Sequence, residues 1–155
     1  MKTTIIATGK LKERYWREAC AEYAKRLSAT TTLAVVEVGD RNPARAGVER
    51  ALQAEGADIL KAVPAQAWCV ALTITGRQRS SEELSAHLGE LKLAGRSHLC
   101  FVIGSSHGLA PEVLARADEQ LSFGPLTLPH NLARVVLLEQ LYRAACISQG
   151  GPYHK

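Results

Sequence analysis

An uninterrupted apolar run, Leu99 to Ile103, constrains the fold of this chain more than any other segment. Apolar and polar residues do not alternate in it, which is typical of a parallel strand that helices cover on both faces. The run stops at Gly104, small and polar residues follow, and Pro111 stands where the first residue of a helix is expected. The segment therefore predicts a strand, a turn and a helix of residues 112–117.

Earlier segments repeat this order of strand and helix. Short runs rich in β-branched or apolar residues predict strands over 3–8, 33–38 and 67–73. Apolar residues at helical spacing predict helices over 11–27, 48–63 and 80–95. Ser80 and Glu83 form a capping-box pattern at the start of the last of these. Four strands alternating with four helices predict an α/β protein with a parallel sheet and right-handed crossovers.

Two further helical patterns carry expectations about packing. Tyr15, Trp16 and Tyr23 follow the apolar spacing of 11–27, and we interpret them as core residues rather than as an RNA surface. The final helix, expected over 132–147 with Asn131 or His130 near its cap, is apolar around almost its whole circumference. A helix of this kind needs two partners, and we expect its own sheet and a second copy of the chain, hence a homodimer.

The composition limits the classes of protein that this chain can belong to. A length of 155 residues predicts one domain, 1–155. A net charge of +4 permits a nucleic-acid partner without requiring one, and Arg41, Arg45 and Arg50 are candidate phosphate contacts. The cysteines are far apart and pair with no histidine at ligand spacing, so we expect reduced thiols and no metal site. The first apolar stretch is too short for a signal peptide or a membrane span, so we expect a cytoplasmic protein with no membrane partner.

The loop after the central strand allows a hydrolase reading. Residues 104–108, GSSHG, match the G-x-S-x-G nucleophile elbow, and Asp118 and His130 follow in the order that an α/β-hydrolase triad requires. The chain is short for that fold, however, and no HGGG-type motif precedes the elbow.

A second loop at 123–128, interrupted by Gly124 and Pro125, suits a ligand held between two loops at the carboxyl ends of strands.

Four blocks in order carry a more specific resemblance: FVIGSSHGL, LSFGPLTLPH, ARVVLLEQLYRA and the terminal PYHK. Together they resemble the ribosomal RNA large subunit methyltransferase H family, a SPOUT-class group of S-adenosylmethionine-dependent enzymes. The opening IIATGKLKERYWREACAEYAKRL is similar to the first strand and helix of that family, so the resemblance spans the chain. The family usually carries two adjacent glycines after the central strand, where this chain has Gly104 and Ser105.

The resemblance implies an α/β fold with a deep trefoil knot in its C-terminal part and a cofactor bound in the knot. Periodicity alone would not predict a knot, because knots are very rare in protein folds. The cofactor is S-adenosyl-L-methionine, and no metal is implied. Carried over by matching motif, its contacts are Leu72, Gly104, Phe123, Gly124, Pro125, Leu126, Thr127 and Leu128.

The reaction that the resemblance implies is methylation of N3 of a pseudouridine in a stem-loop of 23S ribosomal RNA, on the assembled ribosome. The protein must place the base nitrogen in line with the methyl group, help its proton to leave and hold the base out of its stack. We expect the catalytic contacts to come from Tyr142, Arg143 and His154, with Tyr153 and Lys155 beside them on the target side. A third hypothesis is that the protein is an RNA-binding module without catalytic activity.

Overall fold

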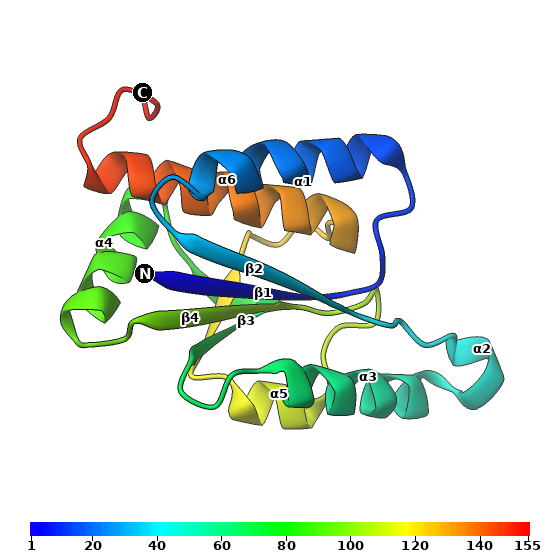
Figure 1. The fold of residues 1–155 in the computed structure, drawn as a ribbon. Helices are drawn as coiled ribbons and strands as arrows, with labels where there is room; N and C mark the ends of the chain where they lie inside the picture. Colours follow the sequence, from blue (N-terminus) through cyan, green and yellow to red (C-terminus); the bar gives the residue numbers. More distant parts are fainter.

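A computed structural model describes residues 1–155, of residue 46 only the backbone. Five parallel strands form one sheet with helices on both faces (Figure 1). The strands are β1 (Lys2–Thr8), β2 (Thr32–Val38), β3 (Trp68–Gln78), β4 (His98–Ile103) and β5 (Glu119–Ser122), in the order β2-β1-β4-β3-β5. The helices are α1 (Arg14–Leu27), α2 (Pro43–Ala46), α3 (Val48–Ala62), α4 (Ser81–Leu93), α5 (Pro111–Arg116) and α6 (His130–Ser148).

The core has two layers, one on each face of the sheet. In β1, Ile5 packs with buried residues of α1, α4 and α6, whereas its neighbour Ile6 packs with Ile59 of α3 and Val113 of α5. In β4, Leu99 to Ile103 are buried throughout. The central strands are thus covered on both faces, which confirms the parallel sheet that the uninterrupted apolar run predicts.

The structure corrects the predicted number of strands. A fifth strand, β5, follows α5 and pairs with β3 at the edge of the sheet. No sequence pattern predicts this strand, because its four residues, EQLS, begin with two polar side chains and show no apolar run. The capping box of Ser80 and Glu83 at the start of α4 is confirmed.

β3 is also longer than predicted, and it bends around β5. It continues past Thr73 to Gln78, and both Leu72 and Arg77 lie opposite Leu121 of β5. Gly76 lies in this bend, where a Cβ atom would sit 2.8 Å from backbone atoms of Gln120 and Leu121. A side chain at this position would therefore push the two strands apart, which explains the glycine inside a strand.

The last helix, α6, packs between α1 and α4 on one face of the sheet (Figure 1). Leu137, Leu138 and Leu141 are buried in this layer. Two helices of the same chain and the sheet thus cover part of α6, while apolar residues such as Val135 and Val136 stay partly exposed, so the second copy remains a prediction. Its N-cap is Pro129, and His130 is the first residue of the helix, so both His130 and Asn131 lie near the cap as expected.

The aromatic residues of α1 have different environments. Tyr23 is half-buried and packs against the core, as predicted, but Tyr15 is 62% exposed, so its interpretation as a core residue is wrong. Cys20, Tyr23 and Leu27 form the stripe that faces α6 and the sheet, and Tyr15 lies beside that stripe in the first turn. Within the part of the chain that the structure describes, no helix combines the length and hydrophobicity that a membrane span requires.

Candidate functional site

A cavity of about 340 Å³, which we call the α6 cavity, lies where the ends of β3 and β5 meet α6. Its walls come from the connection between β3 and α4, from the end of β5 with the loop after it, and from α4 and α6. The lining residues are Gln78, Arg79, Ser80, Ser81, Leu84, Leu121, Ser122, Phe123, Gly124, Val136 and Gln140. Polar and apolar side chains line it together, so it offers both hydrogen-bonding groups and apolar surface to a small molecule.

Two of the predicted cofactor contacts, Phe123 and Gly124, line the α6 cavity. Gly124 has φ +109°, a conformation that only glycine adopts without strain. Ser122 Oγ donates to Ile74 O at 2.8 Å and accepts from Gly124 N at 3.0 Å, so it fixes the loop to β3. The sequence analysis did not select Ser122, because its role depends on the pairing of β5 with β3.

The other predicted cofactor contacts do not line this cavity. Leu72 and Phe123 pack against the same core layer, while Leu126 is exposed. Pro125 and Thr127 are exposed and Leu128 is half-buried. Gly104 ends β4, where a Cβ atom would lie 2.4 Å from Gly108 O. The close approach that requires glycine at Gly104 is therefore that of its own loop.

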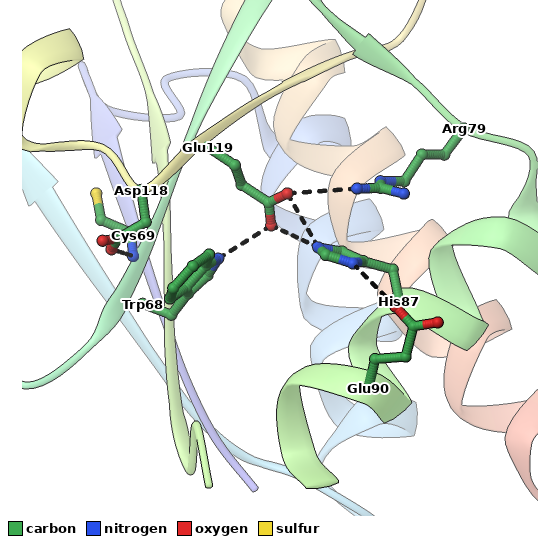
Figure 2. Close-up of polar contacts among 7 residues, drawn as sticks. All are labelled: Trp68, Cys69, Arg79, His87, Glu90, Asp118 and Glu119. Carbon is green, nitrogen blue, oxygen red and sulfur yellow. Dashed lines mark hydrogen bonds and ion pairs between the residues drawn. The ribbon is translucent and has the colours of Figure 1, made fainter. Parts of the chain in front are cut away.

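A second hollow of about 360 Å³ lies at the carboxyl ends of β2 and β4. It holds Ser106 and His130 of the possible hydrolase triad, but Asp118 accepts from Cys69 N at 2.7 Å near the start of β3 (Figure 2). In a parallel sheet the starts and ends of strands lie at opposite edges, so these three residues form no triad. Among the candidate phosphate contacts, all three of them exposed, Arg41 pairs with Asp58 at 3.0 Å.

The predicted target-side residues gather at the end of α6, where the tail folds back on the helix. Arg143 Nε and Nη2 donate to Glu139 Oε1 at 3.0 and 2.7 Å, and the Tyr153 hydroxyl donates to the same oxygen at 3.2 Å. The rings of Tyr142 and Tyr153 meet edge to face at 4.8 Å between centroids. His154 Nε2 lies 2.7 Å from Glu82 Oε1. We call Glu139, Tyr142, Arg143, Tyr153 and His154 the tail cluster.

Two residues of α1 extend the tail cluster. The Arg26 guanidinium lies 5.6 Å from the ring centroid of Tyr23 and 5.8 Å from that of Tyr142, within the range of cation–π attraction. The sequence analysis did not place Arg26 here, because its position depends on the packing of α1 against α6. Cationic and aromatic side chains therefore lie side by side on this surface.

The surroundings of Tyr153 in the tail cluster keep its phenol protonated. Burial and the negative charge of Glu139 raise the pKa of its phenol to about 12. The hydrogen bond to Glu139 also raises the pKa of Arg143 above its ordinary value. At neutral pH Tyr153 is therefore a neutral hydrogen-bond donor and not a base.

A chain of hydrogen bonds connects the tail cluster with the α6 cavity. Gln140 Nε2 donates to Glu139 Oε2 at 2.6 Å, and Ser81 Oγ donates to Gln140 Oε1 at 2.7 Å. Gln140 and Ser81 both line the cavity. A small molecule in the cavity and a ligand at the tail cluster would thus be close neighbours.

A second polar network holds β5 against α4. Figure 2 shows Trp68, His87 and Arg79 directed at the carboxylate of Glu119. The indole Nε1 of Trp68 donates at 3.1 Å, His87 Nε2 lies 2.8 and 2.9 Å from the two oxygens, and Arg79 Nη2 lies at 3.5 Å. Because Arg79 lines the α6 cavity, this network connects β5 to the cavity wall. Within residues 1–45 and 47–155, no group of histidine, cysteine, aspartate and glutamate residues is placed to hold a metal ion.

Comparisons with known proteins identify the family of the chain. Residues 1–154 match the family described as "Predicted SPOUT methyltransferase". Proteins named ribosomal RNA large subunit methyltransferase H from Bifidobacterium adolescentis and Carboxydothermus hydrogenoformans are 50% and 49% identical, with full coverage of both chains in each pair. A probable methylase family protein from Haemophilus influenzae shares the fold with a TM-score of 0.53 at 14% identity, over 99% of this chain and 70% of that one. The chain therefore belongs to the ribosomal RNA large subunit methyltransferase H family of SPOUT methyltransferases.

Proposed function

We propose that the protein transfers a methyl group from S-adenosyl-L-methionine to N3 of a pseudouridine in the 23S RNA of the ribosome. The single observation that carries this proposal is the tail cluster beside the α6 cavity, with cations and aromatic rings next to a site for a small molecule. The relatives of about 50% identity, which carry the name of a large-subunit RNA methyltransferase, support the class of substrate.

The residues of the α6 cavity fit the cofactor. Its volume lies within the range of about 300–1,000 Å³ that is common for small-molecule sites. Phe123 and Val136 offer apolar walls, and Gln78 and Gln140 offer side-chain polar groups. Leu72, Gly104 and the loop 123–128 would complete the site. When bound, the cofactor supplies an electrophilic methyl group, so the protein needs no metal and no covalent nucleophile.

The tail cluster would hold the target base. Tyr142 and Tyr153 offer ring faces for stacking, and Arg26 and Arg143 offer positive charge for the RNA backbone. As N3 gains the methyl group it must lose its proton, and His154 is our proposed acceptor. Tyr153 is a poor acceptor, because a phenol with a pKa of about 12 remains protonated at neutral pH.

We further propose that chain 1–155 is a single domain whose C-terminal part is threaded as a trefoil knot. The match of residues 1–154 to the SPOUT methyltransferase family supports this proposal. We also propose a homodimer in the cytoplasm. Ile74 and Leu126, both exposed and apolar, lie next to segments that line the α6 cavity, and a second copy would cover them. Sedimentation at micromolar concentration tests this, and a stable monomer would contradict it.

The central experiment separates cofactor binding from RNA methylation. We expect calorimetry to detect binding of S-adenosyl-L-methionine and mass spectrometry to detect one added methyl group on large-subunit RNA. Arg143→Ala, or removal of residues 153–155, should leave cofactor affinity intact and reduce methylation, because these groups contact the cavity only through Glu139 and Gln140. Equal damage to cofactor affinity would mean that the tail cluster is not the RNA side of the site.

Variants in the β4–α5 loop test the alternative functions. Gly104→Val should abolish cofactor binding, because its side chain would displace the loop at Gly108, whereas Ser106→Ala should be nearly neutral. A complete loss of activity in Ser106→Ala alone would instead support a serine hydrolase. RNA affinity without any uptake of the cofactor would support a non-catalytic RNA-binding module.

A further inference from the structure

Glu139 is the residue that holds the tail cluster together. One of its oxygens accepts from Arg143 Nε and Nη2 and from the Tyr153 hydroxyl. The other accepts from Gln140 Nε2 at 2.6 Å. Its side chain is 17% exposed, so its oxygens interact mainly with protein donors and little with water.

The carboxylate is well suited to hold a short tail in place. The chain reverses after α6 at Gly150, which has φ +69°, and Gly151 N donates to Cys146 O at 2.9 Å. Terminal residues are usually poorly ordered unless specific contacts tie them down. Beyond the reversal the tail is tied by Tyr153 to Glu139 and by His154 to Glu82. Of these two carboxylates, only Glu139 also holds a residue of α6.

Glu139 does not line the α6 cavity, so it acts on the site through its neighbours. Arg143 and Tyr153 are long side chains that lose rotamer freedom when they are held in one place. Their common partner fixes both at once, with the guanidinium 4.6 Å from the ring centroid of Tyr153. Through Gln140 and Ser81 the same carboxylate is connected with the cavity wall.

We propose that Glu139 is a positioning residue for methyl transfer: it fixes Arg143 and Tyr153 on the RNA side of the site and ties their position to the wall of the α6 cavity. This inference rests on the proposed function. It assigns no contact with cofactor or RNA to Glu139 itself, so its removal should affect the use of RNA and not the binding of cofactor.

The first test compares Glu139→Gln with Glu90→Gln. Both variants remove one negative charge, but Glu90 lies on α4 with its side chain 77% exposed and does not contact the tail. In Glu139→Gln we expect kcat/KM for large-subunit RNA to fall about tenfold, the size of effect that loss of a charged hydrogen bond produces, with unchanged affinity for S-adenosyl-L-methionine. Glu90→Gln should match the wild type. Wild-type activity in Glu139→Gln, or an equal loss of cofactor affinity, would overturn the proposal.

The second test follows Tyr153 directly. The charge of Glu139 contributes to the raised pKa of Tyr153, so ultraviolet titration of the phenols should show this step at lower pH in Glu139→Gln. The titration step that is missing from Tyr153→Phe is the one that belongs to Tyr153. An unchanged step would overturn the proposed contact. In a double-mutant cycle, Glu139→Gln with Tyr153→Phe should lose less activity than the two single losses combined, and full additivity would contradict the coupling.

These readouts also separate the inference from the function on which it rests. If the wild-type protein does not methylate large-subunit RNA, the proposed function fails, and the role of Glu139 in that reaction fails with it. The titration of Tyr153 still judges the contact in that case, because it requires no RNA. If the wild type methylates RNA and Glu139→Gln does so equally well, only the positioning role fails.

Discussion

Replacing Glu119 by alanine should destabilise the protein strongly, because three donors share this carboxylate. The change leaves the Trp68 indole N–H, the His87 ring and the Arg79 guanidinium without their acceptor. The side chains of His87 and Arg79 are only 17% and 10% exposed, so water replaces the lost contacts poorly. The network would break at the junction of β3, β5 and α4.

The size of the effect follows from these exposures. Removing one partner of a buried pair costs about 3–5 kcal/mol, and a single unsatisfied buried donor costs about 1–3 kcal/mol. Because Glu119 is itself 21% exposed, water reaches part of the vacated space. We therefore expect a loss of about 3 kcal/mol in the free energy of unfolding, or about 9 °C in Tm for a chain of this length.

Urea and thermal unfolding, followed by circular dichroism, measure this loss. Glu90→Ala is the matched control, because its carboxylate lies 3.8 Å from His87 Nδ1 but is 77% exposed. That variant should stay within about 0.5 kcal/mol of the wild type. If Glu119→Ala also stays within about 1 kcal/mol, the network does not hold β5 in place and our reasoning on burial is wrong.

Two further predictions concern the sheet. Gly76→Ala should lower the free energy of unfolding by about 1–3 kcal/mol, because its Cβ would lie 2.8 Å from the backbone of β5. The control, Gly89→Ala in α4, should raise the free energy of unfolding by about 0.5–1 kcal/mol, because a Cβ there meets nothing within 4 Å. Equal effects of the two variants in urea unfolding would refute the close approach at Gly76. Burial, and then the charge of Lys2, lower the pKa of His98 in the folded protein. Between this lowered pKa and about pH 6.5, the ordinary pKa of histidine, the unfolded chain therefore binds more protons than the folded one. The free energy of unfolding should fall as the pH drops through this range. The fall should be shallower in His98→Gln, and identical pH profiles of Tm in the two proteins would contradict it.

Local sequence patterns predicted the main elements correctly wherever burial is complete. The strands β1 and β4 and the capping box of α4 follow from residue types within a few positions of one another. β5 did not follow, because its stability depends on pairing with a distant strand and not on its own residues. The apolar circumference of α6 was predicted correctly; α1, α4 and the sheet cover part of it, and the second copy remains a prediction.

The candidate site shows the same difference between contacts that local sequence predicts and contacts that depend on the fold. The resemblance selected Arg143, Tyr153 and His154 as one group, and the structure brings them together at the end of α6. Glu139 and Arg143 are four residues apart on one helix and so lie close together, but the contact of Tyr153 with Glu139 needs the chain reversal at Gly150 and Gly151. Contacts between elements far apart in sequence, such as Arg26 with Tyr142, left no local signal to find.

The packing of α6 between α1 and α4 has a consequence for the newly made chain. The stripe of α1 that holds Cys20 and Leu27, and the face of β1 at Ile5, are covered by α6, a helix that is made long after them. Until α6 has been made, these apolar groups stay exposed to water, so this layer of the core cannot form in the order in which the chain is synthesised. The layer between α1, β1 and α6 is therefore complete only after α6 has been made, and a chain that ends before α6 would expose this apolar surface to proteases.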